Sequence, residues 1–197
     1  MADAIENETF SDEDWYSEEL AERVYTRCTF SQVDLTEATS RGSVFEECAF
    51  HNVRLNASRH TDSAFLRCTF NRCNLFEAEF AGCKLTGSTF KQCDLRPLRV
   101  IGGDWSFVAL PGADLRGAVF QSVRMREVDL TGANCEGATL TDVDLSGAQL
   151  HSANFTRCDL RGSDLTALDP NAVKLAGAII GSAQAVVVAQ SLGFDIR

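Results

Sequence analysis

Large apolar residues recur at every fifth position along most of this chain. From Phe30 to Leu165 the phase never slips, and 26 of the 28 residues at this position are apolar, the exceptions being Ser40 and His60. Two positions before each of them stands a residue that is never charged and is usually Cys, Ala, Val or Ser. An uninterrupted period of this kind is typical of a repeat architecture, in which each unit packs only on its neighbours.

A five-residue period matches neither the helical period nor the strand period. It fits a square coil, in which each unit of five residues forms one side and four units, or 20 residues, close a turn. This pattern predicts an all-β solenoid with an aromatic ladder in its core, formed by Phe30, Phe50, Phe70 and Phe90. Eleven of the 14 glycines stand two positions after the large apolar residue. These positions are the corners of the square, where a type II turn needs a positive φ.

The pattern divides the chain into an acidic N-terminal arm or atypical cap (1–24), a repeat coil of about seven turns (25–168) and a C-terminal cap (169–197). In the first part the inward positions before the large residues hold charges, namely Glu8, Glu13, Glu18 and Arg23. A buried unpaired charge is costly, so we expect no regular coil there, and 17–24 is a candidate helix. In the last part Ser182 is a candidate N-cap of a short helix over about 183–191 that stops at Gly193.

The C-terminal segment is more apolar than a fully solvated helix needs to be. An open solenoid exposes strand edges and core at its last turn, so something must cover that end. Either the segment folds over its own last coil and caps a monomer, or a second copy packs on it about a two-fold axis. The apolar surplus favours a homodimer through the C-terminal end. The residues expected at this dimer interface are Val186, Val187, Leu192, Phe194 and Ile196.

The 197 residues carry a formal net charge of −10, and the distribution is uneven. Residues 127–169 sum to −6, because eight carboxylates are opposed only by Arg157 and Arg161. Two copies beside a two-fold axis would therefore present −12 as one acidic saddle, which attracts a basic groove and does not bind nucleic acid directly. Seven of the carboxylates fall on outward positions: Glu127, Asp129, Glu136, Asp142, Asp144, Asp159 and Asp164.

Candidate catalytic and metal-binding residues are scattered by the same pattern. The eight cysteines occupy inward positions, one at a time, and are interpreted as buried apolar side chains. His51 and His151 point outward five turns apart, whereas His60 lies inward in the same column as Ser40 and is read as a hydrogen-bonded core residue. We therefore expect no enzyme activity, no cofactor and no metal. The chain has no apolar run long enough to span a membrane and begins with acidic residues, so we expect a cytoplasmic protein without membrane contact.

The most regular units resemble a known motif. The segments Ala-Asp-Leu-Arg-Gly at 113–117, Val-Asp-Leu-Thr-Gly at 128–132, Val-Asp-Leu-Ser-Gly at 143–147 and Ser-Asp-Leu at 163–165 are similar to the A-(D/N)-L-x-x motif of pentapeptide repeat proteins. That resemblance implies a right-handed quadrilateral β-helix. The segments Arg-Gly-Ser-Val-Phe at 41–45 and Cys-Asp-Leu-Arg-Pro-Leu at 93–98, together with the unbroken phase and the C-terminal segment, resemble the MfpA/Qnr group of fluoroquinolone-resistance proteins, and its MfpA-like members most.

The resemblance implies a function that the residues alone leave open. Members of this group are described as dimeric DNA mimics that bind DNA gyrase, a type II topoisomerase, and the Qnr members have coils interrupted by loops. The implied role is to modulate or inhibit gyrase and to protect it from fluoroquinolone-type poisons. The alternative is a non-enzymatic scaffold whose carboxylates only keep a rigid rod soluble, with no gyrase interaction.

Overall fold

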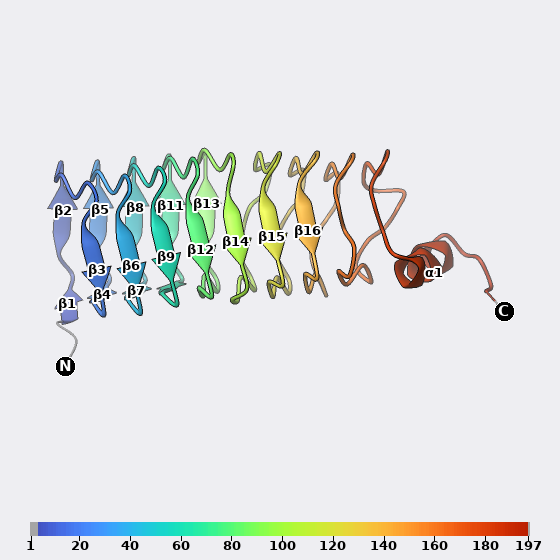
Figure 1. Cartoon of the computed structure of the whole chain (residues 1–197), viewed down its shortest axis with the longest axis horizontal. Coiled ribbons are helices and arrows are strands. Elements are labelled where there is room, and N and C mark those ends of the chain that lie inside the picture. Colours follow the sequence, from blue (N-terminus) through green and yellow to red (C-terminus); the bar gives the residue numbers. More distant parts are fainter. Residues whose placement is uncertain (1–3, 197) are drawn as a thin grey trace.

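The computed structural model describes residues 4–196, which form one straight rod wound as a square coil (Figure 1). Each turn takes 20 residues, so that Phe50 pairs with Phe30 on one side and with Phe70 on the other, in parallel. The predicted quadrilateral β-helix with a short C-terminal helix is confirmed. Among the described residues, no helix has the length and apolar character needed to cross a membrane.

The four sides of the square become four faces that run along the rod, numbered here in the order in which the chain visits them. Face 1 holds β1 (Ala4–Glu6), β4 (Val24–Thr26), β7 (Val44–Glu46) and β10 (Ala64–Leu66). Face 2 holds β2 (Thr9–Ser11), β5 (Thr29–Ser31), β8 (Ala49–His51), β11 (Thr69–Asn71) and β13 (Thr89–Lys91). Face 3 is joined by single bridges such as Asp14↔Asp34. Face 4 holds β3 (Glu19–Ala21), β6 (Thr39–Arg41), β9 (Arg59–Thr61), β12 (Glu79–Ala81), β14 (Arg99–Ile101), β15 (Val119–Gln121) and β16 (Thr139–Thr141).

Two aromatic ladders fill the first half of the core. The predicted ladder is present, with ring centroids 4.8 Å apart between Phe30 and Phe50 and 4.6 Å apart at each of the next two steps to Phe90. A second ladder, which the sequence analysis did not identify, stacks Tyr25, Phe45 and Phe65 at 5.0 and 4.6 Å. Offset stacking adds a favourable contribution beyond the burial of each ring. The second half of the core is built mainly from leucines in the same inward position.

All eleven glycines predicted at corners have positive φ, between 62 and 76°. The corner does not depend on glycine, because 21 other residues adopt the same left-handed conformation two positions after the large apolar residue. The coil favours this conformation, since the N–H of a corner residue donates to the carbonyl of the residue just before the next corner in its column, as from Glu127 to Ser146 at 2.9 Å.

The expectation that residues 1–24 cannot form regular coil is wrong for residues 4–24. Strand β1 pairs with β4, β2 with β5 and β3 with β6 in the same register as the rest of the rod, and the candidate helix at 17–24 is absent from this described segment. The charged inward positions are tolerated because, among residues 4–196, no coil lies beneath the first one. Glu8, Glu13 and Glu18 are exposed at the open end, and Arg23 is half-buried.

The C-terminal helix α1 (Ser182–Ser191) matches the predicted range, but its N-cap is Gly181 and not Ser182. Repeat pairing continues past residue 168 and reaches Ile179, which bridges Asp159. The buried Gln184 fixes the helix to the last complete coil. Its amide nitrogen donates to the carbonyls of Leu160 and Ser163, at 2.7 and 2.8 Å, and its oxygen accepts from Gly181 N–H at 2.7 Å.

Candidate functional site: an acidic surface on two faces

The seven carboxylates predicted to form a saddle are spread over all four faces. Asp144 continues the column of Arg124 on face 1, Asp129 that of Ala109 on face 2, and Asp159 that of Thr139 on face 4. Glu136 follows Asn134 on face 3. The remaining three lie on face 1 or at its two corners: Glu127, Asp142 and Asp164. The structure therefore does not bring all seven together.

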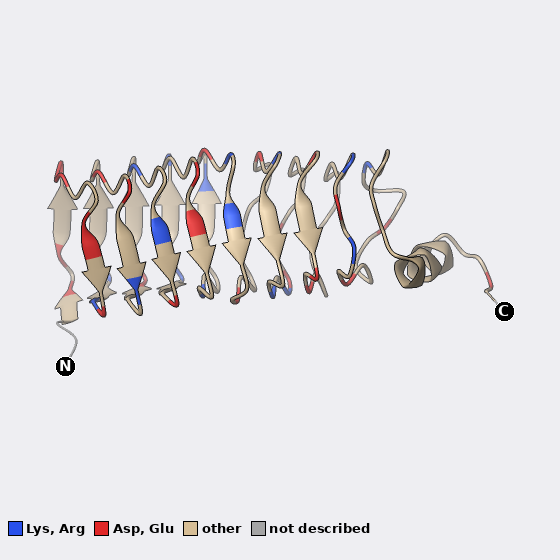
Figure 2. Cartoon of the chain, in the orientation of Figure 1, with Lys and Arg blue, Asp and Glu red and all other residues tan. Residues whose placement is uncertain are grey.

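Ion pairs neutralise the carboxylates on faces 3 and 4. The Arg157 guanidinium contacts Glu136 across one turn, and Arg161 contacts Asp159 at 2.7 Å within the same turn. The Arg161 guanidinium also lowers the pKa of Asp159 below its ordinary value. Strands β15 and β16 add no charged residue to face 4 (Figure 2).

The unbalanced charge of residues 127–169 therefore lies on two neighbouring faces. Arg157 and Arg161 neutralise two of the eight carboxylates. The other six account for the net −6 and lie on faces 1 and 2; Asp169, the sixth, is assigned there by its place in the repeat. We call the five predicted carboxylates on these faces the acidic surface. They are Glu127, Asp129, Asp142, Asp144 and Asp164. Asp144 also pairs with Arg126, which precedes the block, at 2.9 Å.

The repeat motif itself orients the aspartates on the sides of the coil. In each, one carboxylate oxygen accepts the backbone N–H two residues later: from Thr131 to Asp129 at 2.9 Å, and from Thr166 to Asp164 at 2.9 Å. This Asx turn holds the carboxylate against the backbone and leaves it half-buried but open to solvent. A neighbouring glycine makes room at the corner, because a Cβ on Gly162 would meet an oxygen of Asp142 at 2.0 Å.

The pKa of Asp144 shows how these contacts compete. Partial burial alone would raise it, but hydrogen bonds from the hydroxyl and N–H of Ser146 and the charge of Arg126 outweigh that effect, so the pKa is lowered. The carboxylate is therefore ionised at neutral pH and held in one orientation. Asp129, Asp144 and Asp164 can therefore contact a cationic partner without first ordering their side chains.

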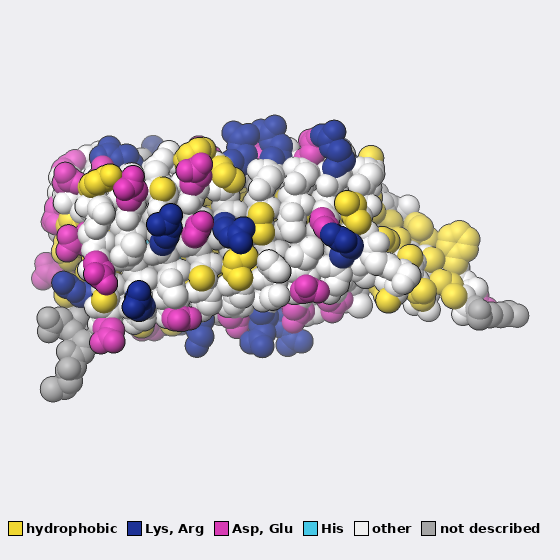
Figure 3. Space-filling view, in the orientation of Figure 1, with side chains coloured by type: hydrophobic (Ala, Val, Ile, Leu, Met, Phe, Trp, Pro, Cys, Tyr) yellow, Lys and Arg dark blue, Asp and Glu magenta, His cyan; other side chains and the backbone are white. Residues whose placement is uncertain are grey.

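The predicted dimer residues form an apolar end beyond the last coil, visible as a hydrophobic cluster in Figure 3. Four of them are exposed and Val187 is half-buried; the exposed ones are Val186, Leu192, Phe194 and Ile196. Phe194 has the largest exposed fraction, at 66%. Beneath the helix a cavity of about 150 Å³ lies between Val188 and the leucines of the last turns.

The polar core residues carry no accessible chemistry. The Ser40 hydroxyl lies 2.8 Å from Nδ1 of His60, and both side chains are almost fully buried, as predicted. Burial lowers the pKa of His60 to about 3, so it is neutral at physiological pH. All eight cysteines are free thiols, and seven are buried; Cys93 is half-buried, which corrects its assignment as fully buried. Within residues 4–196 no cluster of His, Cys, Asp or Glu is arranged to hold a metal ion.

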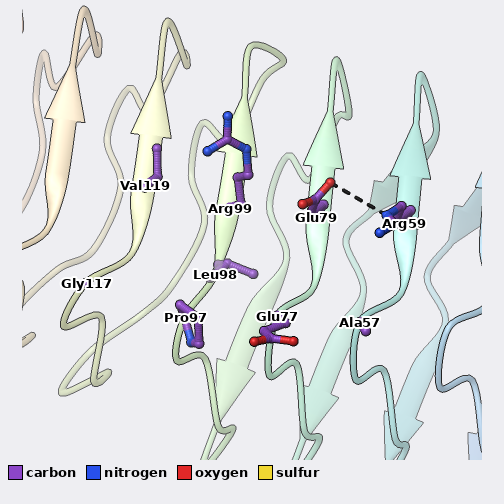
Figure 4. A pocket seen from close by; sticks show the side chains of 9 residues that line it. All are labelled: Ala57, Arg59, Glu77, Glu79, Pro97, Leu98, Arg99, Gly117 and Val119. Carbon is purple, nitrogen blue, oxygen red and sulfur yellow. Dashed lines mark ion pairs between the residues drawn. The ribbon is translucent and has the colours of Figure 1, made fainter.

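A depression of about 350 Å³ marks the corner between faces 3 and 4 (Figure 4). It lies between the turn at Pro97 and Leu98 and the column of Arg59, Glu79 and Arg99. Arg59 pairs with Glu79 at 3.8 Å. This depression is on the opposite side of the rod from the acidic surface and contains no histidine, cysteine or serine among its lining residues.

Comparisons with known proteins agree with this geometry. The chain matches the family model of pentapeptide repeats in eight copies, over residues 61–96, 106–134 and 129–166. No curated protein matches it by sequence. The repeat and the coil together make this chain a pentapeptide repeat protein.

Within that class, the fold matches solved structures of QnrB1, described as a plasmid-mediated fluoroquinolone resistance protein. Two trypsin-treated QnrB1 variants are each 23% identical to this chain with a TM-score of 0.90; all of this chain and 100% or 98% of theirs are covered. Full-length QnrB1 is 20% identical with a TM-score of 0.68, over 97% of this chain and 100% of that one. At this identity the likeness shows the fold, and closeness to the MfpA-like members stays a prediction.

Proposed function

We propose that this protein is a DNA mimic that binds DNA gyrase in the cytoplasm, modulates or inhibits it, and protects it from fluoroquinolone-type poisons. One observation carries the proposal: six of the eight carboxylates in residues 127–169 gather on two neighbouring faces of a straight rod, where the one ion pair found among the described residues for these six is that of Asp144 with Arg126. A one-sided acidic rod is complementary to a basic groove that normally holds a duplex.

The fold supports the choice of partner. QnrB1, whose coil superposes on this one along its whole length, is named as a fluoroquinolone resistance protein. Fluoroquinolones poison type II topoisomerases, whose DNA path is the kind of basic groove that this surface fits. The charge density is lower than that of DNA, which carries about one charge per 1.7 Å of duplex. The mimicry is therefore local, confined to the coils that carry the acidic surface.

We also propose that two copies associate through the apolar C-terminal end. That end exposes Val186, Leu192, Phe194 and Ile196 on a short segment beyond the last coil. Introducing a charge there, as in Phe194→Asp, should yield monomers because a buried carboxylate opposes the association. Light scattering measures the mass. A wild-type monomer, or an unchanged dimer in the variant, would contradict this arrangement.

The test of the gyrase proposal is a supercoiling assay with the purified full-length protein. We expect inhibition that weakens as salt is added, because charge-driven association is screened within about 8 Å at physiological ionic strength. Neutralising four carboxylates on face 1 and its corners should abolish inhibition while lowering thermal stability only slightly, through the lost ion pair between Asp144 and Arg126. This variant combines Glu127→Gln, Asp142→Asn, Asp144→Asn and Asp164→Asn.

A matched control separates location from total charge. Neutralising four carboxylates of the first coil changes the net charge by the same amount, and we expect it to retain most of the inhibition. This control combines Asp12→Asn, Glu13→Gln, Glu18→Gln and Glu19→Gln. Equal loss of inhibition in both variants would mean that total negative charge, and not its location, causes the inhibition. Full activity of the first variant, or no inhibition by the wild type, would leave the scaffold alternative.

A further inference from the structure

Phe107 stands at the corner between faces 1 and 2, one turn before Glu127. It has a φ of 60° and so adopts the left-handed corner conformation. Every other non-glycine residue with positive φ in residues 4–196 is polar, charged or alanine. A bulky aromatic residue is disfavoured in this conformation, so local structure gives no reason for its presence.

The Phe107 ring also contributes little to packing. It is 54% exposed, and none of the aromatic contacts found among the described residues involves it. The neighbour in the preceding turn of the same corner column is Gly87, which offers no side chain to cover the ring. Within its own turn the adjacent corners are Gly102 and Gly112, so no neighbouring corner side chain covers the ring.

Phe107 borders the acidic surface on one side, one turn before Glu127. Its backbone N–H donates to the carbonyl of Arg126, whose side chain pairs with Asp144 on face 1. Glu127 follows in the same column, and its side chain extends over Gly147, away from the ring. Aromatic side chains surrounded by polar groups are the usual anchors of protein interfaces, because they bury a large area in a partner pocket at a small entropic cost.

We infer that Phe107 is the apolar anchor of the acidic surface and inserts into an apolar pocket beside the basic groove of the partner. This inference rests on the proposed function and adds to it a contact that duplex DNA does not make. The carboxylates set the salt-dependent part of the affinity, and Phe107 sets a part that salt does not screen. The apolar contact therefore distinguishes a protein groove that has an adjoining apolar pocket from other cationic surfaces.

The experiment measures binding of the full-length protein to purified gyrase at three salt concentrations. Phe107→Ser and Phe107→Gly should each weaken binding by about tenfold or more at every salt concentration, with the salt dependence unchanged. Phe76, which is 42% exposed on face 3, provides the matched control. Phe76→Ser should stay within about twofold of the wild type, because that residue lies away from the acidic surface.

Phe107→Gly also excludes a folding defect, because glycine suits a positive φ better than phenylalanine. We expect its melting temperature to equal or exceed that of the wild type while its binding falls. Wild-type binding by both Phe107 variants, or equal loss in Phe76→Ser, would overturn the anchor and leave the gyrase proposal standing. Absence of gyrase binding by the wild type would overturn both. A lower assembly mass for Phe107→Gly would place a second copy on the ring and also overturn the inference.

Discussion

The first coil and the coils that follow share one five-residue pattern but differ in whether charged residues occupy the inward positions. In the first coil the inward positions hold Glu8, Glu13 and Glu18, and all three are exposed. One turn later the same positions hold Cys28, Val33 and Ala38, each about 1% exposed or less. The difference teaches that a position in the repeat is inward only where another coil covers it. The end of a solenoid follows different rules from its interior, although the backbone is the same.

The same comparison applies to the two acidic regions. The carboxylates of the first coil surround an open end on all sides, whereas those of the C-terminal half are sorted by ion pairs onto faces 1 and 2. Similar amounts of charge therefore present different surfaces. Only the second is a one-sided acidic stripe along the rod.

The largest effect that tests this comparison is a charge placed in a covered inward position. Cys48 is 1% exposed, and its thiol donates to the carbonyl of Tyr25 at 3.4 Å. Cys48→Glu should cost about 4 kcal/mol or more, because the carboxylate has no partner there. Glu8→Ala, in the same column of the first coil, should change stability by less than about 0.5 kcal/mol, because Glu8 is exposed. Urea unfolding, monitored by circular dichroism, measures the stability of both variants. Similar losses of stability would contradict the statement that a position is inward only where another coil covers it.

The aromatic ladder gives a second contrast between covered and uncovered positions. Phe70→Ala should cost about 3–5 kcal/mol, since the ring is fully buried between two stacked neighbours. Phe10, in the first coil, stacks on Phe30 at 5.1 Å but is only half-buried. Phe10→Ala should therefore cost about half as much. Chemical denaturation of the two variants compares them directly, and an equal cost would show that the first coil is packed like the interior.

His60 gives a smaller, pH-dependent contrast. The native pKa of about 3 lies below the ordinary value of 6.5, so the unfolded state binds a proton that the native state does not. Stability from this residue is complete above pH 6.5 and is lost as the pH falls toward 3. Between pH 7 and pH 5 the loss should be about 2 kcal/mol.

The control for this pH effect is His60→Gln, whose amide can still hydrogen-bond to Ser40 and to Ser58, whose hydroxyl lies 3.1 Å from Nε2 of His60. The variant leaves every other residue unchanged, including the half-buried His51 and the exposed His151. We expect its unfolding free energy to fall less between pH 7 and pH 5 than that of the wild type. Identical pH profiles would mean that His60 is not neutral in the native core.

The sequence alone determined the coil, because the five-residue period is local and repeats without a slip. Once Phe30, Phe50 and Phe70 fall on one column, the register, the ladder and the left-handed corners follow from backbone geometry. The C-terminal helix was also predictable, within one residue at its cap. These features depend on which residues follow one another and on the turn that they close.

Only the tertiary structure decided what depends on neighbours one turn away. The pattern assigned Glu8 to an inward position, but no coil of the described residues covers it, and the side chain is exposed. It placed seven carboxylates outward, but the contacts of Arg157 with Glu136 and of Arg161 with Asp159 cancelled two of them and left one acidic side. The five-residue period did not indicate Gln184 or Phe107. The contacts of Gln184 depend on the end of the coil, and the exposure of Phe107 depends on the residues around its corner. Charge balance and exposure are properties of a surface, and the surface exists only after the coil has closed.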